Sequence, residues 1–434
     1  MSKKILLFTT QLWPTAALLA DGLNRAGLSV AALRPGAHPL RSLRSLTYQQ
    51  NYQHLQRHAL ISKALAESGA DYIFPCDDVA VSVLHQHHAR LKDTGGPANE
   101  LATLEASLGD PRHYDVLERK SAFVAEANKI GIGTPESSAI ASADELTRLT
   151  ARVSWPMVLK SDGWWGGRGT CIVHSQEEAL RAYDELVGAS SLFSALKDAG
   201  RASSLMPFFS RNSDARRTIV LQAFKPGCAL NRAVLCDSGR VIAGHTFEAV
   251  QSFPGNGAAT VVRLREAPAI DAAVERLVQH FGISGFAGFD FIYDEASDEA
   301  WLLEVNPRVT SACYTAPKGA RSLAHVLAEH LAEPQRPYLK PLRAPAAALE
   351  QLIALFPQEI ERDASSRFLT SADHQVPWHE PDFVRSCIEL ATRQNIYRKS
   401  ADVLKGLLGR CAQAQNLGVI DGELGERRVA SARH

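Results

Sequence analysis

Long apolar runs, net charge and paired cysteines are missing from this chain of 434 residues, and each absence excludes a class of protein. No stretch approaches the apolar length of a membrane span, and the short apolar run at the start ends at Thr9, which is too early for a signal peptide. Lys plus Arg and Asp plus Glu number 47 each, so no global charge directs the protein to nucleic acid or to an anionic membrane. We therefore expect a cytoplasmic protein that binds neither.

Metal-binding and disulfide patterns are also lacking. The seven cysteines are scattered without a CxxC pair, and their number is odd, which favours reduced thiols over a disulfide framework or a zinc site. His85, His87 and His88 lie in one expected helix, and we expect no metal site there. The length and the ordinary globular composition predict two to four packed units.

Two common nucleotide-binding signatures do not occur in the glycine-rich stretch 163–169. Its spacing is GxxGGxG, without the Gly-Lys-Ser/Thr of a phosphate-binding P-loop, and a strand rather than the helix of a dinucleotide fingerprint follows it. Glycines still let backbone amides approach phosphates closely, and Lys160 just before them can neutralise phosphate charge. Trp164 and Trp165 can shield a reactive intermediate, although a packed surface hairpin is an equally good interpretation.

Strands and helices alternate in the first part of the chain. We expect strands at 3–9, 29–33 and 71–76, and helices at 15–26 and 54–68. This alternation predicts a parallel sheet with helices on both faces. Because ligands of such sheets bind beyond the carboxyl ends of the strands, Thr9-Thr10-Gln11 and Asp77-Asp78 are candidates for the rim of a site. Helix capping and turn formation are the alternative role for these residues.

Acidic residues interrupt two apolar runs near residue 300. Alternate residues of a strand share a face, so Glu304, Asn306 and Arg308 are expected to project together. A turn at 294–299 can fold the preceding run back as a hairpin and bring Asp290 close to Glu304. Magnesium prefers such hard oxygen ligands together with substrate phosphates, so the hairpin predicts a magnesium site. Polar residues that merely face solvent are the alternative.

The remaining elements follow from periodicity, capping boxes and glycine stops. We expect further helices at 120–129 and 271–281, and further strands at 158–160, 170–174, 218–224, 233–237 and 241–245. Capping boxes at 142–145 and 175–178 open two more helices. Residues 189–215 are interpreted as an insertion, residues 345–409 as mostly helical, and the polar tail from about 411 as loose.

Taken together, these elements resemble the ATP-grasp superfamily, in which two α+β subdomains clamp ATP between them. The resemblance covers roughly residues 116–330 and implies three parts. These are an N-terminal α/β (pre-ATP-grasp) domain at 1–115, a two-lobed ATP-grasp domain at 116–335 with its small lobe at about 151–225, and a mainly helical C-terminal region at 336–434.

The resemblance also implies residue roles. Phosphate is assigned to Lys120, Lys160 and the loop glycines Gly166, Gly167 and Gly169; adenine to Gln222 and Phe224; magnesium to Asp290, Glu304 and Asn306; and phosphate or substrate to Arg308. The family often has an acid where Gln222 stands, and glutamine can still accept a hydrogen bond from the adenine amine. An acid that usually holds the ribose is missing near Ala229, and Asn231 is the expected substitute.

The activity that the resemblance implies is an ATP-dependent, ADP-forming carboxylate–amine ligase that acts on small, amino acid or peptide-like molecules through an acyl phosphate. Its cofactors would be ATP and Mg²⁺, for which Mn²⁺ can substitute, and the family expectation is a homodimer. Arg232 and Arg308 are candidates for the substrate carboxylate, because a guanidinium fork suits it; a surface role is the alternative for Arg232. The loop 252–260 resembles the loop that lines the acceptor pocket in many family members.

Two other functions remain open. A bicarbonate-activating carboxylase or carbamoyl-phosphate-like enzyme would use the same motifs; no biotin-accepting Met-Lys pair occurs in the chain, which leaves a separate carrier protein open. The third alternative is a non-catalytic ATP-binding protein. A binder of that kind has no need for the two lysines and the three magnesium ligands together.

Overall fold

The fold is known from a computed structural model, which describes residues 3–161, 169–188, 218–254, 257–316, 318–333 and 346–395. Several predictions from the sequence lie outside these residues. They concern Gly166, Gly167, the two tryptophans beside them, the insertion at 189–215, residues 396–409 and the tail from 411.

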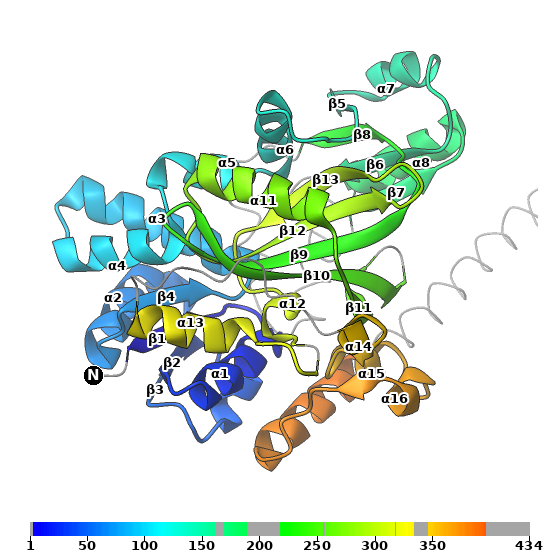
Figure 1. The fold of residues 1–434 in the computed structure, drawn as a ribbon. Helices are drawn as coiled ribbons and strands as arrows, with labels where there is room; N and C mark the ends of the chain where they lie inside the picture. The colour runs from blue at the N-terminus through cyan, green and yellow to red at the C-terminus, as the bar shows by residue number, and fades with distance from the viewer. Residues whose placement is uncertain are drawn as a thin grey trace, which may run out of the picture.

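The N-terminal part contains a four-stranded parallel sheet in the order β3-β2-β1-β4, with helices on both faces as predicted (Figure 1). Alternate residues of β1 enter different cores: Ile5 and Leu7 pack with α1, whereas Leu6 and Phe8 pack with α2, α3 and α4. The strands are β1 (Lys4–Phe8), β2 (Ser29–Arg34), β3 (Tyr48–Asn51) and β4 (Tyr72–Pro75), and the helices are α1 (Thr15–Arg25), α2 (Arg57–Ser68), α3 (Asp78–Thr94) and α4 (Ala98–Leu108).

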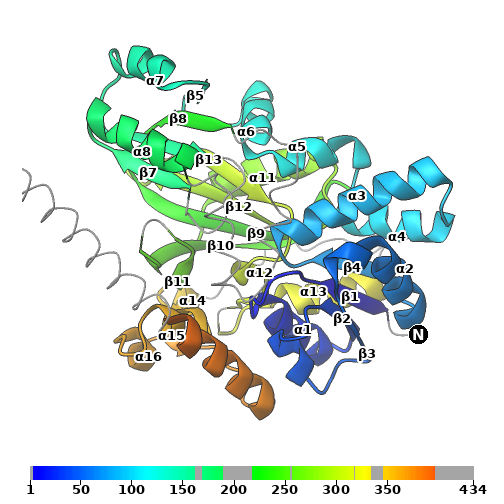
Figure 2. The ribbon, with the colours of Figure 1, turned by 180° about the vertical axis from the view of Figure 1, so that it is seen from behind.

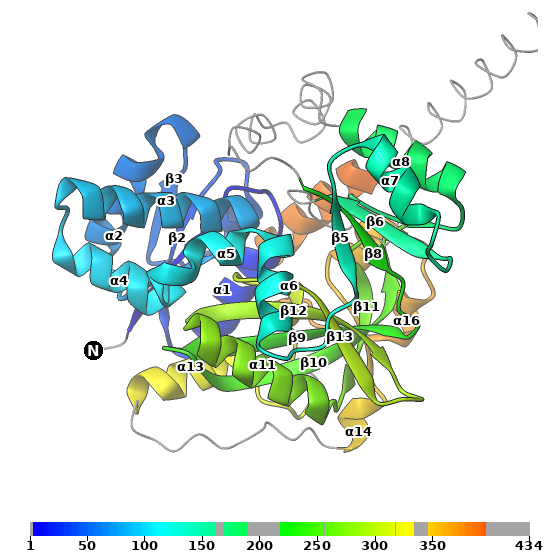
Figure 3. The same cartoon turned by 90° about the horizontal axis from the view of Figure 1, so that it is seen from above.

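A small antiparallel sheet in the order β5-β8-β6-β7 forms a separate lobe (Figure 3). Two helices cover one of its faces and bury Leu159 and Leu221 against it. Their N-termini match the capping boxes, because Ser142 and Ser175 each accept a backbone N–H three residues on. The strands are β5 (Ser137–Ile140), β6 (Met157–Ser161), β7 (Thr170–Val173) and β8 (Ile219–Ala223), and the helices are α7 (Ala143–Thr150) and α8 (Gln176–Gly188).

The largest sheet has seven strands in the order β13-β12-β9-β10-β11-β14-β15, and only the last pair is parallel. Helices α6 (Lys120–Lys129) and α11 (Pro268–Phe281) pack on one face through Phe123, Phe281 and Phe289. The opposite face packs on α1, α12 (Ser311–Tyr314) and α13 (Leu323–Ala332) (Figure 2). The first five strands are β9 (Cys228–Asp237), β10 (Arg240–Ser252), β11 (Ala259–Arg265), β12 (Gly285–Asp294) and β13 (Glu299–Asn306).

The C-terminal region packs on the N-terminal part and also extends the large sheet. Its helices are α14 (Ala346–Leu349), α15 (Gln358–Arg362), α16 (Phe368–Ser371) and a helix at 381–395, as the prediction of a mainly helical region requires. Two short strands that were not predicted, β14 (Leu352–Ala354) and β15 (Asp373–His374), extend the large sheet. Phe383 and Cys387 are fully buried in the core that contains α1. Among the described residues, no helix has the length and apolar character that crossing a membrane requires.

Candidate active site

The hairpin of β12 and β13 brings the two predicted acids together. Asp290 lies directly opposite Glu304 in the antiparallel register, and Gly288 lies opposite Asn306. The two carboxylates are within hydrogen-bond reach of each other. Gly288 keeps room beside them, since a Cβ there would lie 2.8 Å from Cγ2 of Thr310 and 3.2 Å from the amide nitrogen of Asn231. The prediction that a turn at 294–299 folds the strands back on each other is therefore confirmed.

Three nitrogen donors surround the two carboxylates. Lys120 Nζ, from the start of α6, lies 2.7 Å from Glu304 Oε2. Asn306 Nδ2 donates to Asp290 Oδ2 at 2.9 Å, and Asn231 Nδ2, from the neighbouring strand β9, donates to Asp290 Oδ1 at 2.6 Å. The structure thus places Asn231 in the acidic cluster, because it lies opposite Asp290 in the sheet register.

Burial and charge push the two carboxyl pKa values in opposite directions. Burial raises the pKa of Asp290 well above its ordinary value, and the charge of Glu304 raises it further. Burial would also raise the pKa of Glu304, but the ammonium of Lys120 outweighs this and lowers it, with a contribution from Lys160. The same carboxylate of Glu304 raises the pKa of Lys120 although burial opposes it. The cluster therefore favours one proton on Asp290 and an ionised Glu304.

Arg308 connects this cluster to the N-terminal sheet. Its Nη2 lies 2.9 Å from Asp78 Oδ2 and 3.1 Å from Asn306 Oδ1, and its guanidinium lies 5.5 Å from the ring centre of Trp13. Burial lowers the pKa of Arg308, but Asp78 outweighs that and raises it. Asp78 is one of the residues expected at the rim of a site beyond the carboxyl ends of β1 and β4. Its contact with Arg308 thus links this rim to the β12–β13 hairpin.

The neighbouring Asp77 has a structural task. Its carboxylate is fully buried, caps α3 through the backbone N–H of Ala80, and accepts hydrogen bonds from Thr9, Thr10 and Gln11. The capping role that was the alternative for this pair of acids therefore holds for Asp77. Its bonds to residues 9–11 fix the loop after β1, and this loop leads to Trp13.

The structure separates Arg232 from the cluster, which corrects its assignment as a candidate for the substrate carboxylate. Successive residues of a strand point to opposite faces, so Arg232 points away from the face that carries Asn231. Its Nη1 lies 3.1 Å from Asp271 Oδ1 on α11 and 3.3 Å from the hydroxyl of Thr246. This buried ion pair, on the face of the large sheet that α6 and α11 cover, replaces the catalytic role predicted for Arg232.

We predict that Arg232→Met lowers the free energy of unfolding by about 3 kcal/mol, because it leaves Asp271 partly buried without its partner. Affinity for magnesium nucleotide should stay unchanged, since Arg232 lies on the other face of the sheet. Urea unfolding and nucleotide titration measure the two quantities. Arg240→Met, at an exposed ion pair with Asp237, is the control and should cost less than about 1 kcal/mol. If Arg232→Met lost nucleotide binding at unchanged stability, this would contradict the placement of Arg232 outside the nucleotide site.

The small lobe presents the other predicted nucleotide residues. Lys160 on β6 and Gln222 on β8 share the face that points away from α7 and α8, because their strand neighbours Leu159 and Leu221 are buried under those helices. Gln222 is 3% exposed and donates its amide nitrogen to the hydroxyl of Ser137 at 2.9 Å. Phe224, just past the end of β8, is 36% exposed.

The structure describes only parts of two loops that the sequence analysis assigned to the site. At the glycine-rich loop, the carbonyl of Gly169 accepts a hydrogen bond from the backbone N–H of Ser161 at 2.9 Å and closes the base of the β6–β7 hairpin. At the loop 252–260, the backbone N–H of Phe253 donates to the carbonyl of Ala258 at 3.0 Å, and residues 255–256 lie outside the described part.

The donor set suits a hard divalent cation that also binds a phosphate. In the described part of the chain, no group of three or more His, Cys, Asp or Glu side chains could hold a metal. The pair of carboxylates is instead accompanied by amides, and the Oδ1 atom of Asn231 is buried without a hydrogen-bond partner in the structure. Asn306 turns its nitrogen to the carboxylates and its oxygen to Arg308, so its amide has to rotate before it can act as a ligand.

Sequence reasoning missed two contacts at this site. Trp13 was not singled out, although its place just after the carboxyl end of β1 was a signal. The contact between Asn231 and Asp290 depends on the register of β9 with β12, for which the sequence has no local signal.

Comparison with known proteins agrees with this geometry. Residues 119–316 match the family model described as the ATP binding domain of the carbamoyl-phosphate synthase L chain. Curated relatives include the C-terminal section of the carbamoyl phosphate synthase large chain of Methanopyrus kandleri, 23% identical over 201 residues, and the large chain of Gemmatimonas aurantiaca, 26% identical over 209 residues. Each match covers 46% of this chain but only 34% and 17% of those relatives.

Solved structures share the fold over a larger part of the chain. The biotin carboxylase domain of 2-oxoglutarate carboxylase from Hydrogenobacter thermophilus, in complex with MgADP, ADP and bicarbonate, has a TM-score of 0.54 at 14% identity, covering 78% of this chain and 71% of that one. The carboxyaminoimidazole ribonucleotide synthase of Aspergillus clavatus, complexed with ATP, has 0.54 at 17% identity, covering 81% and 80%. An L-amino acid ligase from Bacillus licheniformis has 0.51 at 15% identity, covering 76% and 75%.

At these identities the structural likeness shows the fold, and the family model shows which ATP-binding domain the fold contains. The matched residues include Lys120, Lys160 and the whole β12–β13 hairpin. Residues 119–316 therefore form an ATP-binding domain of the ATP-grasp type.

Proposed function

We propose that the protein is an ATP-dependent, ADP-forming carboxylate–amine ligase that acts on small, amino acid or peptide-like molecules. One observation carries this proposal. Lys120, Glu304, Asp290, Asn306 and Arg308 form a continuous chain of contacts, which the contact of Arg308 with Asp78 extends to the N-terminal part of the molecule. Two cationic groups, Lys120 and Arg308, thus flank the two carboxyl groups on the path where phosphate, metal and carboxylate would meet.

The proposed division of the chain follows from the sequence. Residues 1–115 would supply one wall of the site, residues 116–335 the ATP-grasp domain, and residues 336–434 an appended region. The small lobe would hold the base: with its nitrogen donating to Ser137, Gln222 would offer its oxygen to the adenine amine. Phe224 would pack beside the base. The ribose role of Asn231 stays a prediction, and its contact with Asp290 favours a place at the metal instead.

Asp290, Glu304 and a rotated Asn306 would hold Mg²⁺, with Mn²⁺ as a substitute. When bound, the ion would supply charge neutralisation between the phosphates of ATP. Lys120 on α6 and Lys160 in the small lobe would neutralise the remaining phosphate charge. Both lower the pKa of Glu304, so their ammonium groups already influence this part of the site. Arg308 would orient the substrate carboxylate with its guanidinium fork.

The reaction would proceed in two steps. A carboxylate oxygen of the substrate attacks the γ-phosphorus of ATP, and ADP leaves. The nitrogen of the second substrate then attacks the carbonyl carbon of the acyl phosphate, loses a proton, and expels inorganic phosphate. Phosphoryl transfer needs positioning and charge neutralisation more than covalent help from the protein, which is what the lysines and Arg308 provide.

The raised pKa of Asp290 predicts a pH-dependent metal affinity. Below this raised pKa, Asp290 keeps a proton and cannot act as a ligand, so magnesium binding must release the proton. Affinity for Mg²⁺ should therefore increase as the pH rises through the pKa of Asp290 and then level off. Calorimetry in buffers of different ionisation enthalpy measures the released proton. Binding without proton release on the acid side of that rise would contradict the proposed ligand role of Asp290.

ADP release from the purified protein tests the function. The protein is incubated with magnesium ATP and a panel of small carboxylates, each with and without amino acids as acceptors. ADP that appears only with a particular carboxylate–amine pair supports the ligase. Release with bicarbonate alone would favour the carboxylase-like alternative. No release, with ATP binding demonstrated separately, would favour a non-catalytic binder. A cytoplasmic location and a homodimer are part of the proposal.

A further inference from the structure

One aromatic side chain at the site has no role in the function proposed above. Trp13 lies in the loop between β1 and α1, and its ring centre is 5.5 Å from the guanidinium of Arg308. A cation within about 6 Å of the face of an indole ring is attracted by the quadrupole of the ring. The side chain of Arg308 is only 13% exposed, and this attraction is stronger where water is excluded. The contact joins the N-terminal part of the molecule to the arginine that we assign to the substrate carboxylate.

The loop that carries Trp13 is held at two points. At its start, the buried carboxylate of Asp77 accepts hydrogen bonds from the backbone N–H and the hydroxyl of Thr10. Further on, the carbonyl of Trp13 accepts a hydrogen bond of 2.9 Å from Nε2 of His38. Nδ1 of the same ring accepts from the backbone N–H of Leu40, so the ring proton must be on Nε2. His38 is fully buried, and burial lowers its pKa to about 3, so this arrangement persists at neutral pH.

The other contacts of Arg308 use its nitrogen atoms. Nη2 lies 2.9 Å from Asp78 Oδ2 and 3.1 Å from Asn306 Oδ1, and Nη1 donates to the carbonyl of Val309. Nε has no hydrogen-bond partner among the described residues. Attraction to an aromatic ring does not occupy an N–H group. Trp13 can therefore hold the cation while N–H groups remain available for a substrate carboxylate.

We propose that Trp13 is a positioning residue, whose indole ring holds the guanidinium of Arg308 in the orientation that binds the substrate carboxylate. This inference rests on the role proposed above for Arg308. A side chain that is already ordered binds its ligand more tightly, because less conformational freedom is lost on binding. Exclusion of water by the ring also strengthens the attraction between a guanidinium and a carboxylate. The ring acts on the substrate only through Arg308, so binding of magnesium nucleotide at the hairpin should depend on it much less.

Steady-state kinetics of Trp13→Leu, with the carboxylate–amine pair that supports ADP release, test the positioning role. Leucine is apolar but has no aromatic face. We expect KM for the carboxylate to rise about tenfold, as for the loss of a largely buried cation–π contact. KM for magnesium ATP and kcat should stay within about twofold, because the lost binding is the same in the ground state and in the transition state. Trp13→Phe should raise KM for the carboxylate less, since phenylalanine keeps a weaker aromatic face.

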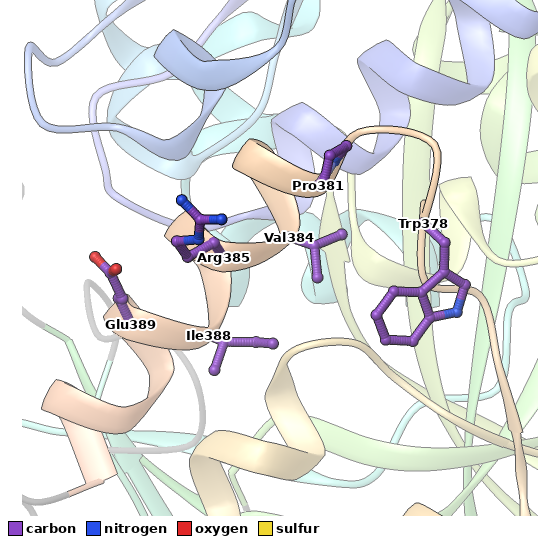
Figure 4. A pocket seen from close by; sticks show the side chains of 6 residues that line it. All are labelled: Trp378, Pro381, Val384, Arg385, Ile388 and Glu389. Carbon is purple, nitrogen blue, oxygen red and sulfur yellow. The ribbon is translucent and has the colours of Figure 1, made fainter.

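Trp378→Leu is the matched control for the loss of an indole ring. Trp378 is 72% exposed and lines a surface groove on the helix 381–395 together with Ile388 (Figure 4). Its replacement should leave all three kinetic constants as they are in the unaltered protein.

A double-mutant cycle tests the contact without any substrate. Urea unfolding compares Trp13→Leu, Arg308→Met and the variant that carries both changes. Because the ring and the guanidinium attract each other, the double variant should lose less stability than the sum of the two single variants. The same cycle with Trp378→Leu in place of Trp13→Leu should be additive.

Two results would overturn the inference. One is an additive cycle for Trp13 and Arg308. The other is a Trp13→Leu enzyme whose KM for the carboxylate is unchanged, or changes together with KM for magnesium ATP and kcat as in a general loss of packing. If Trp13→Leu does not fold, Trp13→Phe must still raise KM for the carboxylate above the Trp378→Leu control. If the unaltered protein releases no ADP with any pair, the proposed function fails, and the cycle still decides whether Trp13 holds Arg308.

Discussion

Glu304→Gln is expected to lower the rate of ADP formation by about a hundredfold or more, the usual cost of losing one preorganised electrostatic group. Glutamine keeps the shape of the side chain but removes the charge that pairs with Lys120 and would bind magnesium. The loss should appear as weaker magnesium binding and a lower kcat together. Steady-state kinetics at several magnesium concentrations separate the two effects.

Glu299→Gln is the matched control for this change. It lies at the exposed start of the same strand, β13, and should leave kinetics and magnesium binding as they are in the unaltered protein. A Glu304→Gln enzyme that keeps its rate within a few-fold would remove the hairpin from the proposed mechanism. An equal loss in the Glu299→Gln control would show that the effect comes from strand stability instead.

Lys120→Met should have an effect of similar size, about a hundredfold or more, because it removes a positive charge from the proposed phosphate site. Its pH dependence gives a second readout. Lys120 holds the pKa of Glu304 below its ordinary value although burial acts to raise it. Without the ammonium, the pKa of Glu304 should rise, so the acid limb of the rate profile should move to higher pH. Rate measurements across the pH range report both changes.

Lys129→Met is the control on the same helix. Lys129 lies near the end of α6, is 73% exposed and pairs only with Glu126 among the described ion pairs. Its replacement should change the rate little and leave the pH profile in place. A Lys120→Met profile whose acid limb does not move would contradict the proposed control of Glu304 by Lys120.

The elements with strong local patterns were predictable from the sequence. The apolar strands of the N-terminal sheet and the β12–β13 hairpin follow directly from alternation, turn residues and glycine stops. The positions of Asp290 and Glu304 opposite each other could be inferred because both are fixed by one short turn. The family model matches residues 119–316, the part of the chain that contains this hairpin.

Contacts between distant segments could not be predicted in this way. The face on which Arg232 projects depends on how β9 is aligned with β12, and a shift of one residue would have exchanged it with Asn231. Strands β14 and β15 are three and two residues long; β14 forms on the edge of β11, and β15 forms on the edge of β14. The ion pair of Asp78 and Arg308 likewise requires the packing of two domains.

Transfer of oxygen from the carboxylate substrate to phosphate is the measurement that tests the central claim most directly. The carboxylate of the active pair is labelled with ¹⁸O on both oxygens, and the inorganic phosphate is analysed by mass spectrometry. Formation of an acyl phosphate predicts ADP and phosphate that carries one ¹⁸O atom, while the amide product retains the other. Unlabelled phosphate, or AMP in place of ADP, would contradict the proposed ligase reaction.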